Sequence, residues 1–187
     1  MTKEKILLQP TYIQIKMDCN HAMIYTNNVI LTRNVVAPYS YMSSKTFVSD
    51  IQKTLESKYG GFCNKEGYIQ SGSIHIEEDG ISIGIMNEGD VLFEIRFTCN
   101  VFSPFEGQEL KCRVVEVANI GVHGESADES PSPFILNIHF HHYNDIESIE
   151  TLKEMKPGDI FYAVVKEISY EQKDTEITII GSFSRKL

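Results

Sequence analysis

Hydrophobic and polar residues alternate with a period of two along most of this chain, but one segment in its first half breaks that period. In SSKTFVSDIQKTLESKYGG, the apolar residues Phe47, Ile51 and Leu55 recur every four positions. Serine ahead of such a run and glycine behind it, here Gly60, are the usual start and stop signals of a helix. The pattern therefore predicts one amphipathic helix in this segment.

Alternating segments on both sides of this helix predict β-strands. One strand is expected around Val29 to Val36, and a long half-buried strand is expected from Val91 to Val101. Between them, residues 74–76 and 81–85 alternate on either side of Asp79-Gly80, which predicts a hairpin. Because the helix must cover one face of an antiparallel sheet, the first half of the chain is expected to have an α+β arrangement.

The alternation pauses at FSPFEG, residues 102–107, and an all-β pattern follows. Cys112 and Val114 lie on one parity, whereas Val115 and Val117 carry the apolar face on the other. A change of parity within one strand predicts a bulge or a sharp coil, which a strand needs where it bends around a small closed barrel. Further strands are expected over 134–140, 160–168 and 177–183, with a short helix over 146–155. Five strands with a helix before the last two fit a five-stranded OB-type barrel.

The pause itself is typical of a short, stiff junction between two domains. Pro104 fixes its own φ angle and favours an extended residue before it. Phe102 and Phe105, on either side of Pro104, are expected to anchor in the cores of the two domains, and Gly107 ends the junction. A linker this short with buried anchors predicts a fixed angle between the domains. The expected organisation is an N-terminal extension over 1–27, an N-terminal domain over 28–103 and a barrel domain over 104–187.

The charge balance restricts the function classes. The chain has 26 acidic and 17 basic residues, a formal net charge of -9. Proteins that grip phosphate backbones usually carry a basic face, so any contact with nucleic acid is expected to be weak or assisted by a partner. No apolar run approaches the roughly 20 residues of a membrane-spanning helix, and the N-terminus lacks the apolar core of a secretory signal. We expect an intracellular protein without membrane contact, whose cysteines are free thiols.

Three segments carry a resemblance to a known family: GGFCNKEGYI (60–69), VLFEIRFTCNVFSPFEGQELKCRV (91–114) and ITIIGSF (177–183). Together they resemble the stalk subunit of multisubunit DNA-directed RNA polymerases, the family of the seventh subunit of eukaryotic polymerase II and of its archaeal counterpart, the E-prime polypeptide. The F-x-P-F-x-G junction is the most specific part. The resemblance implies an α+β tip domain with an RNP-like fold, a helix on an antiparallel sheet, followed by an all-β S1-like OB barrel.

The resemblance also implies the role and partners of such a protein. It would be a non-catalytic part of the polymerase, without a cofactor, that acts in transcription and its initiation. Its tip would dock on the large core subunits near the clamp, its barrel would lie near the RNA exit path, and a small helical subunit would bind along both domains. By position, the residues expected to dock on the core are Pro38, Gly60, Gly61, Phe62, Cys63, Asn64, Lys65, Glu66, Gly67 and Tyr68.

The sequence departs from the family pattern in the second barrel strand and at the N-terminus. Segment 121–126 reads GVHGES, whereas S1 domains often present aromatic rings there for base stacking. Contact with nascent single-stranded RNA is therefore expected to be weak, and its candidate residues are His123, His139, His141 and Tyr143. Aligning Pro38 with the family's early proline leaves 27 extra residues at the N-terminus, whereas aligning Pro10 with it places an insertion behind Pro10. The Ile- and Asn-rich composition would suit the AT-rich genome of a large DNA virus, with the protein in a cytoplasmic viral factory or virion; a cellular polymerase would place it in the nucleus.

Two other function classes fit parts of the sequence. A free-standing S1/OB factor that binds single-stranded RNA would account for the barrel, with Phe134 or Tyr143 as stacking rings. An enzyme or metal site would rest only on the run IHFHHY (138–143), since imidazole is a common metal ligand. His139 and His141 share a face there, but no carboxylate or cysteine lies at ligand spacing. No catalytic motif is evident, so we expect neither a bound metal nor an enzymatic activity.

Overall fold

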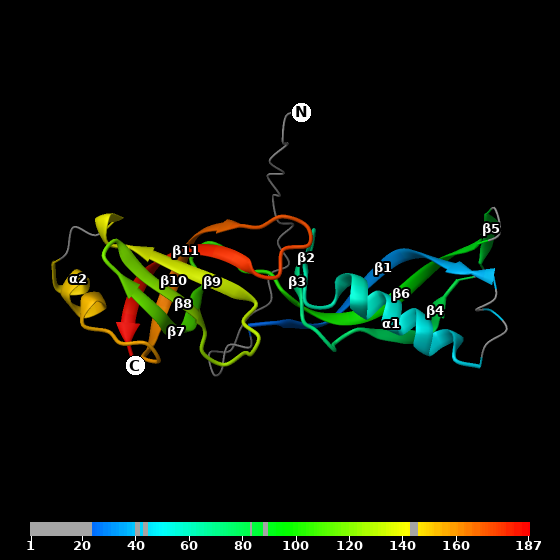
Figure 1. Ribbon diagram of the computed structural model, residues 1–187, viewed down its shortest axis with the longest axis horizontal. Helices are drawn as coiled ribbons and strands as arrows, with labels where there is room; N and C mark the ends of the chain where they lie inside the picture. The colour runs from blue at the N-terminus through cyan, green and yellow to red at the C-terminus, as the bar shows by residue number, and fades with distance from the viewer. Residues whose placement is uncertain (1–23, 40–41, 43–44, 83, 88–89, 143–145) are drawn as a thin grey trace, which may run out of the picture.

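The chain folds into two β-rich parts that lie end to end (Figure 1). The computed structural model describes residues 24–39, 42, 45–82, 84–87, 90–142 and 146–187. Within them the chain is mostly β, with two α-helices, α1 (Phe47–Tyr59) and α2 (Ile146–Lys153). One part is a six-stranded sheet, β1 to β6, which we call the N-terminal sheet. The other is a closed barrel of five strands, β7 to β11.

The N-terminal sheet is organised around one long strand, β6 (Asp90–Phe102). β1 (Thr26–Pro38) pairs with it in antiparallel register, from Pro38 opposite Asp90 to Thr26 opposite Val101. Three short strands pair with the other edge of β6: β5 (Ile85–Asn87), β4 (His75–Ile81) and β3 (Gly67–Ile69). A fourth short strand, β2 (Cys63–Asn64), pairs with β3. The strands expected around 29–36 and 91–101 are confirmed, and the odd-numbered apolar residues of β6 are buried as their alternation predicted.

The helix α1 covers one face of this sheet with the residues whose spacing predicted it (Figure 1). Ile51 and Leu55 are buried in one cluster with side chains of β1 and β6. The Phe47 ring meets Phe93 of β6 edge-on, with 5.2 Å between ring centroids. The helix ends before Gly60, as expected from the glycine pair.

The hairpin predicted over residues 74–85 is wrong. In the described part of the chain, β4 and β5 pair one after the other with β6 and not with each other. The register slips between Ile76 and Ile81, so residues 77–80 bulge out of β4 instead of reversing the chain. Gly80 permits this bulge because its backbone packs on the Arg96 carbonyl oxygen, where an added Cβ would clash. The chain reverses one strand later, between β5 and β6.

The barrel is built from β7 (Glu109–Ala118), β8 (Gly121–Ser126), β9 (Phe134–His139), β10 (Ile160–Ser169) and β11 (Ile177–Lys186). Its strands neighbour one another in the order β7-β8-β9-β11-β10, and β10 pairs back onto β7 to close it. β11 runs parallel to β9, whereas the other pairs are antiparallel. A 3-10 turn (Phe140–His142) and α2 lie between β9 and β10. The five-stranded closed barrel is therefore confirmed.

The bulge predicted in the first barrel strand is also present. Pairing between β7 and β8 shifts register between Val114 and Glu116. Val114 is buried, Val115 is exposed, and Val117 packs against the barrel core from the other parity. One extra residue in the strand thus accounts for the change of parity.

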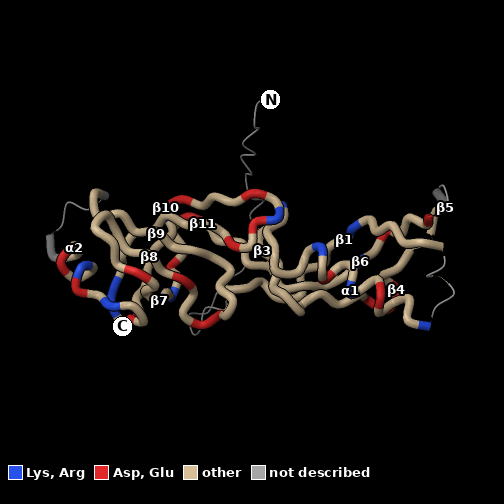
Figure 2. Tube along the Cα trace, in the orientation of Figure 1, with Lys and Arg blue, Asp and Glu red and all other residues tan. Residues whose placement is uncertain are grey.

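Charged residues are distributed along both parts, with acidic and basic residues interleaved (Figure 2). Four cations of the barrel each lie 2.8 to 3.4 Å from a carboxylate: Lys111, Arg113, Arg185 and Lys186. Exposed pairs of this kind typically contribute about 0 to 1 kcal/mol to stability. Their main effect is to neutralise the cations that could otherwise attract a phosphate backbone.

Buried side chains form two clusters, and their boundary does not follow the linker. One cluster lies between α1 and the N-terminal sheet. The other fills the barrel but also includes Tyr25, Cys63, Tyr68 and Phe102, which precede it in the sequence. The two parts therefore share a continuous apolar contact at the place where the chain passes from one to the other.

Candidate functional site

Segment 60–68, expected to dock on a partner, forms the β2–β3 hairpin at the barrel end of the N-terminal sheet. Gly61 donates its backbone N–H to the Ile69 carbonyl at 2.8 Å, and Ile69 donates to the Phe62 carbonyl at 3.1 Å. Gly67 turns the chain at a φ of 126°, a left-handed conformation that favours glycine. Its backbone also packs on the Phe102 carbonyl oxygen, where an added Cβ would clash. The tight turn therefore depends on glycine at this position.

The free edge of β2 pairs with the barrel. The Cys63 N–H donates to the Asp174 carbonyl at 2.7 Å, and the Lys173 N–H donates to the Cys63 carbonyl at 2.9 Å. Lys173 and Asp174 belong to the loop between β10 and β11. Cys63 and Tyr68, which face each other across the hairpin, are only 1% and 2% exposed. The edge of β2 is therefore already paired with another segment of the same chain.

Aromatic side chains fill the space beneath this contact. The Phe102 ring lies 5.4 Å from the Phe134 ring between centroids, and Tyr25 meets Phe102 edge-on at 6.2 Å. Tyr68 is buried and Tyr170 packs against the same cluster. Burial raises the pKa of Tyr68 and of Tyr170, so both phenols stay neutral at physiological pH. We call these five residues the joint.

Only one of the two phenylalanines in the predicted junction is an anchor. Phe102 is fully buried, but Phe105 is 56% exposed, so the prediction that it enters a core is wrong. The Phe105 N–H donates to the Gln108 side-chain oxygen, and the Gln108 N–H donates back to the Phe105 carbonyl, which makes a tight turn. Gly107 completes the turn at a φ of 87°, and its N–H donates to the Val165 carbonyl of β10. Backbone bonds hold this side of the junction where a second buried ring was expected.

The residues predicted to dock on a partner do not form one surface. Pro38 lies opposite Asp90 at the start of β6, whereas the hairpin lies beside Phe102 at its end. β6 has 13 residues, which span about 40 Å at roughly 3.3 Å per residue. Within the hairpin, Cys63, Asn64, Gly67 and Tyr68 are buried, while Gly60, Gly61, Phe62 and Glu66 are half-buried and Lys65 is exposed. The predicted docking residues are therefore not contiguous, because Pro38 and the hairpin lie at opposite ends of β6. The assignment of the hairpin to docking stays a prediction.

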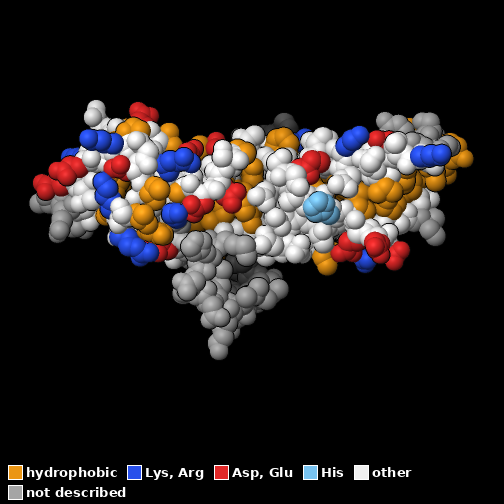
Figure 3. Space-filling view, turned by 90° about the horizontal axis from the view of Figure 1, so that it is seen from below, with side chains coloured by type: hydrophobic (Ala, Val, Ile, Leu, Met, Phe, Trp, Pro, Cys, Tyr) orange, Lys and Arg blue, Asp and Glu red, His pale blue; other side chains and the backbone are white. Residues whose placement is uncertain are grey.

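A larger exposed apolar surface lies at the opposite end of the N-terminal sheet (Figure 3). Val36 of β1 lies opposite Leu92 of β6, and Leu92 lies opposite Ile85 of β5, so the three side chains form a row on one face. Large apolar side chains that are 47 to 67% exposed occur in the segments at this end of the sheet. Not all of them lie on the face of the row, since Met86 has the opposite parity to Ile85. Together we call them the apolar end: Val36, Tyr39, Met42, Val48, Ile85 and Met86.

This surface could not be predicted from the alternation of apolar and polar residues. Alternation predicts which residues share one face of a sheet, but not whether another element of the fold covers that face. The available signal was the pair Ile85-Met86, which is apolar on both parities at the end of a strand. Contiguous exposed apolar surface is typical of protein interaction sites.

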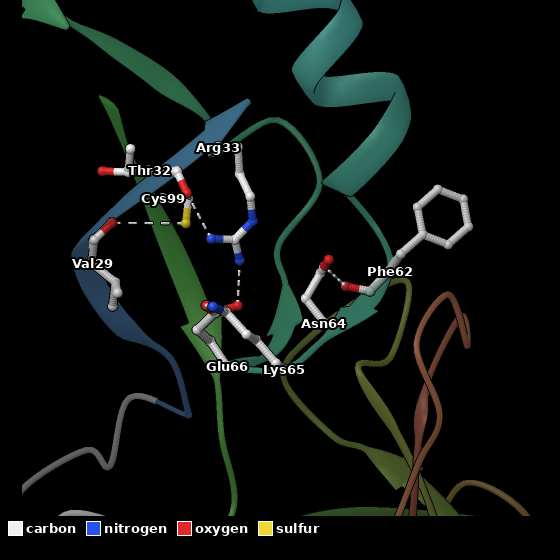
Figure 4. Close-up of polar contacts among 8 residues, drawn as sticks. All are labelled: Val29, Thr32, Arg33, Phe62, Asn64, Lys65, Glu66 and Cys99. Carbon is white, nitrogen blue, oxygen red and sulfur yellow. Dashed lines mark hydrogen bonds and ion pairs between the residues drawn. The ribbon is translucent and has the colours of Figure 1, made fainter. Parts of the chain in front are cut away.

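A cleft of about 450 Å³ opens beside the hairpin, next to β1 and the end of α1. In its wall, Arg33 Nη2 donates to Glu66 Oε2 at 2.5 Å and Nη1 donates to the Thr32 carbonyl at 2.9 Å (Figure 4). The guanidinium carbon lies 5.6 Å from the centroid of the Tyr59 ring. Lys65 Nζ approaches the other oxygen of the same carboxylate at 3.6 Å. Because Glu66 neutralises Arg33, these contacts fix the hairpin to β1 and leave little positive charge for a ligand.

The candidate RNA-contact histidines lie on the outer side of the barrel. His123 of β8 places Nδ1 2.6 Å from the Asn137 side-chain oxygen of β9. His139 and His141 lie close together, with 5.4 Å between ring centroids, and Tyr143 lies outside the described residues. Within the described chain, no three His, Cys, Asp or Glu side chains are placed to hold a metal ion. His123, His139 and His141 could therefore contact a ligand through hydrogen bonds and through the faces of their rings.

The buried cysteines have no nucleophilic character at neutral pH. Burial raises the pKa of Cys63 and of Cys112 to about 12, and that of Cys99 to about 11. Because the thiolate is the reactive form, all three stay protonated thiols. Among the described cysteines, each is free and buried.

Comparison with known proteins adds no family assignment: no protein-family model and no curated protein matches the chain. Within the described residues, no helix is both long and apolar enough to cross a membrane.

Proposed function

We propose that this protein is a non-catalytic stalk subunit of a multisubunit DNA-directed RNA polymerase. The observation that carries the proposal is the joint. The F-x-P-F-x-G motif, which gave the resemblance its specificity, lies where the two parts meet, and Phe102 within it packs on Phe134 of the barrel. A subunit that projects from a large enzyme needs such a packed connection between the part that docks and the part that extends.

The architecture supports the two domains that this proposal requires. We interpret the N-terminal sheet with α1 on one face as the α+β tip domain, over residues 28–103. We interpret the barrel as the S1-like OB domain, over residues 104–187, because its strand order and the helix before its last two strands suit an OB-type barrel. Tyr25 and Thr26, within the expected 1–27 extension, belong to the joint and to β1, so the first domain of this proposal begins before residue 28.

We assign core docking to the apolar end in place of the β2–β3 hairpin. The apolar end is the part of the N-terminal sheet farthest from the barrel, so a protein docked there would project its barrel outward. Its exposed Val36 and Ile85 would be removed from water by the surface of a large core subunit, which favours association. The rim of the hairpin, at Phe62 and Lys65, remains available to a small helical partner that binds along both domains.

Weak contact with nascent single-stranded RNA is assigned to His123 and His139 on the outer face of β8 and β9 and to His141 in the turn that follows β9. The ion pairs around the barrel and the net charge of -9 both oppose strong binding to a phosphate backbone. The barrel in this proposal lies near the RNA exit path and contacts RNA or regulatory factors. The protein would be found with its polymerase, in a nucleus or in a viral factory.

The test is affinity purification of the tagged full-length protein from its native lysate in mild salt, with identification of every co-purifying chain. We expect the two largest polymerase subunits to be recovered, and to be lost from the double variant Val36→Asp, Ile85→Asp. The matched control is Ile120→Asp, which changes an equally exposed residue of the barrel (66%) and should leave recovery unchanged. Recovery of RNA or ribosomal proteins without polymerase would instead favour a free-standing factor that binds single-stranded RNA.

A further inference from the structure

The loop between β10 and β11 contacts the N-terminal sheet in a way that the linker does not require. It lies alongside β2 and exchanges two backbone hydrogen bonds with Cys63, one in each direction. Residues 171–175 of this loop have exposed side chains, so backbone groups and not side-chain burial hold this part in place. We propose that residues 171–175 form a latch that sets the angle between the N-terminal sheet and the barrel.

The backbone conformation of the latch is specialised for this contact. Lys173, whose N–H donates to the Cys63 carbonyl, has a φ of 74°, which is uncommon for a residue with a side chain. Asp174 accepts from the Cys63 N–H, and its side-chain carboxylate accepts from the Glu171 N–H at 2.7 Å within the loop. The loop is therefore shaped by its own bonds so that adjacent N–H and C=O groups meet the edge of β2.

The covalent connection alone does not fix the angle. Ser103 and Phe105 are exposed, and Gly107 adopts a φ that few other residues tolerate. Phe102 and Phe134 hold the two parts together, but ring contacts are not directional in the way that paired backbone hydrogen bonds are. The latch lies on the other side of the hairpin from this linker and supplies a second, oriented point of attachment. Two separate attachments define an angle, whereas one permits a hinge.

The latch would restrict the angle between the two parts whichever partner binds. Any partner that contacts both parts meets one fixed arrangement while the latch is closed. A partner that competes for the edge of β2 would release the barrel to rotate about residues 103–107. The angle between the parts is then controlled by a contact at the opposite end of the N-terminal sheet from the apolar end.

The test compares two substitutions at Lys173 in the full-length, isotope-labelled protein. Lys173→Pro removes the N–H and imposes a φ near −65°, so it opens the latch. Lys173→Gly keeps the N–H and accepts a positive φ, so it preserves the latch. Hydrogen exchange of the Cys63 amide reports whether the latch is closed, and residual dipolar couplings report the relative orientation of the two parts.

We expect the native protein and Lys173→Gly to fit one common alignment tensor for both parts. In Lys173→Pro, the Cys63 amide should exchange at least about 10-fold faster, and each part should require its own tensor while its core amides keep their chemical shifts. A single common tensor in Lys173→Pro despite fast Cys63 exchange would overturn the proposal, because the joint alone would then hold the angle.

A second variant covers the case in which proline leaves the amide protected or disturbs the barrel. Insertion of Gly-Gly between Gln172 and Lys173 displaces the loop from β2 without a proline. It should give the same fast Cys63 exchange and the same two tensors. Undiminished protection of the Cys63 amide in both variants would also overturn the proposal, since the loop would not be the partner of that amide.

Discussion

Phe102, the last residue of β6, and Phe134, the first residue of β9, lie with their ring centroids 5.4 Å apart, and both are fully buried. They come from different sheets and from opposite sides of the linker. Their contact makes the core of the barrel continuous with the barrel end of the N-terminal sheet. The two parts should therefore unfold together and not as independent units.

Truncation of either ring should show this coupling. Phe134→Ala is expected to lower the free energy of unfolding by about 3 to 5 kcal/mol, the usual cost of removing a buried phenylalanine. Phe102→Ala should have a similar effect, and a double-mutant cycle should give a coupling of about 0.5 to 1.5 kcal/mol between the two rings. Urea denaturation, followed by signals from both parts, measures these values.

The matched control for that prediction is Phe105→Ala, three residues from Phe102 but exposed to solvent. Its effect should stay within about 0.5 kcal/mol, as for most surface substitutions. If Phe105→Ala destabilised the protein as much as Phe102→Ala, the assignment of a single aromatic anchor would be wrong.

Gly67 is expected to be the least replaceable glycine of the hairpin. Gly67→Ala must accommodate a Cβ against the Phe102 carbonyl oxygen at a φ of 126°, so either the hairpin or the end of β6 has to move. Gly72→Ala provides the comparison, since Gly72 also has a positive φ, 75°, but open space around it. Gly72→Ala should cost about 1 kcal/mol for the left-handed conformation, and Gly67→Ala clearly more. Thermal melting of the two variants side by side checks the order, and equal losses would refute the steric argument.

The ion pair between Arg33 and Glu66 should contribute more to stability than the pair between Arg96 and Glu77. Arg33 and Glu66 are 16% and 23% exposed, so water screens their attraction less than that of the more exposed pair. Glu66→Gln is expected to cost about 1.5 to 3 kcal/mol, as for a hydrogen bond to a charged group. Glu77→Gln should cost about 0.2 to 1 kcal/mol. Chemical denaturation at low and at high salt distinguishes them, because only the exposed pair should lose its contribution in high salt.

The parts of the fold that could be predicted from the sequence are those in which burial alone decides. The odd-numbered residues of β6 and the four-residue spacing in α1 each require one apolar face, and the structure buries that face. The parity change at Val115 similarly required a bulge or a sharp coil, and the structure has a bulge there. In these cases the spacing of apolar residues along the chain directly reflects the burial that forms the element.

The errors arose where the outcome depends on contacts between segments distant in sequence. Asp79-Gly80 resembles a turn, but the close approach of Gly80 to the Arg96 carbonyl makes it part of a bulge against β6. Phe102 and Phe105 look alike in the sequence, and Phe102 is buried because Tyr25, Tyr68 and Phe134, all distant in sequence, meet around it. The docking hairpin was predicted as a free surface because nothing near residue 63 indicates that the Asp174 carbonyl will bond to it.

The buried thiols give a prediction that tests the core of both parts at once. The pKa values of Cys63 and Cys112 are about 12 and that of Cys99 is about 11, against an ordinary value of 9.0, with burial as the largest cause in each case. In a Cys19→Ser background, these thiols should react slowly with a thiol reagent at about pH 8 and rapidly once guanidinium chloride unfolds the chain. Rapid labelling of the native protein would contradict the burial on which the joint and both cores depend.

The same shifts set the sign of the pH dependence. Between about pH 9 and 12 the unfolded chain releases protons from these thiols while the folded chain retains them, so the free energy of unfolding should fall as pH rises. Below pH 9 both states are protonated and the contribution is fully present. Cys112→Ala should reduce the steepness of this fall by removing one titrating thiol, because burial is the cause of its shift. Urea midpoints of the native protein and of Cys112→Ala across this range measure the difference, and identical slopes would show that Cys112 ionises equally well in both states.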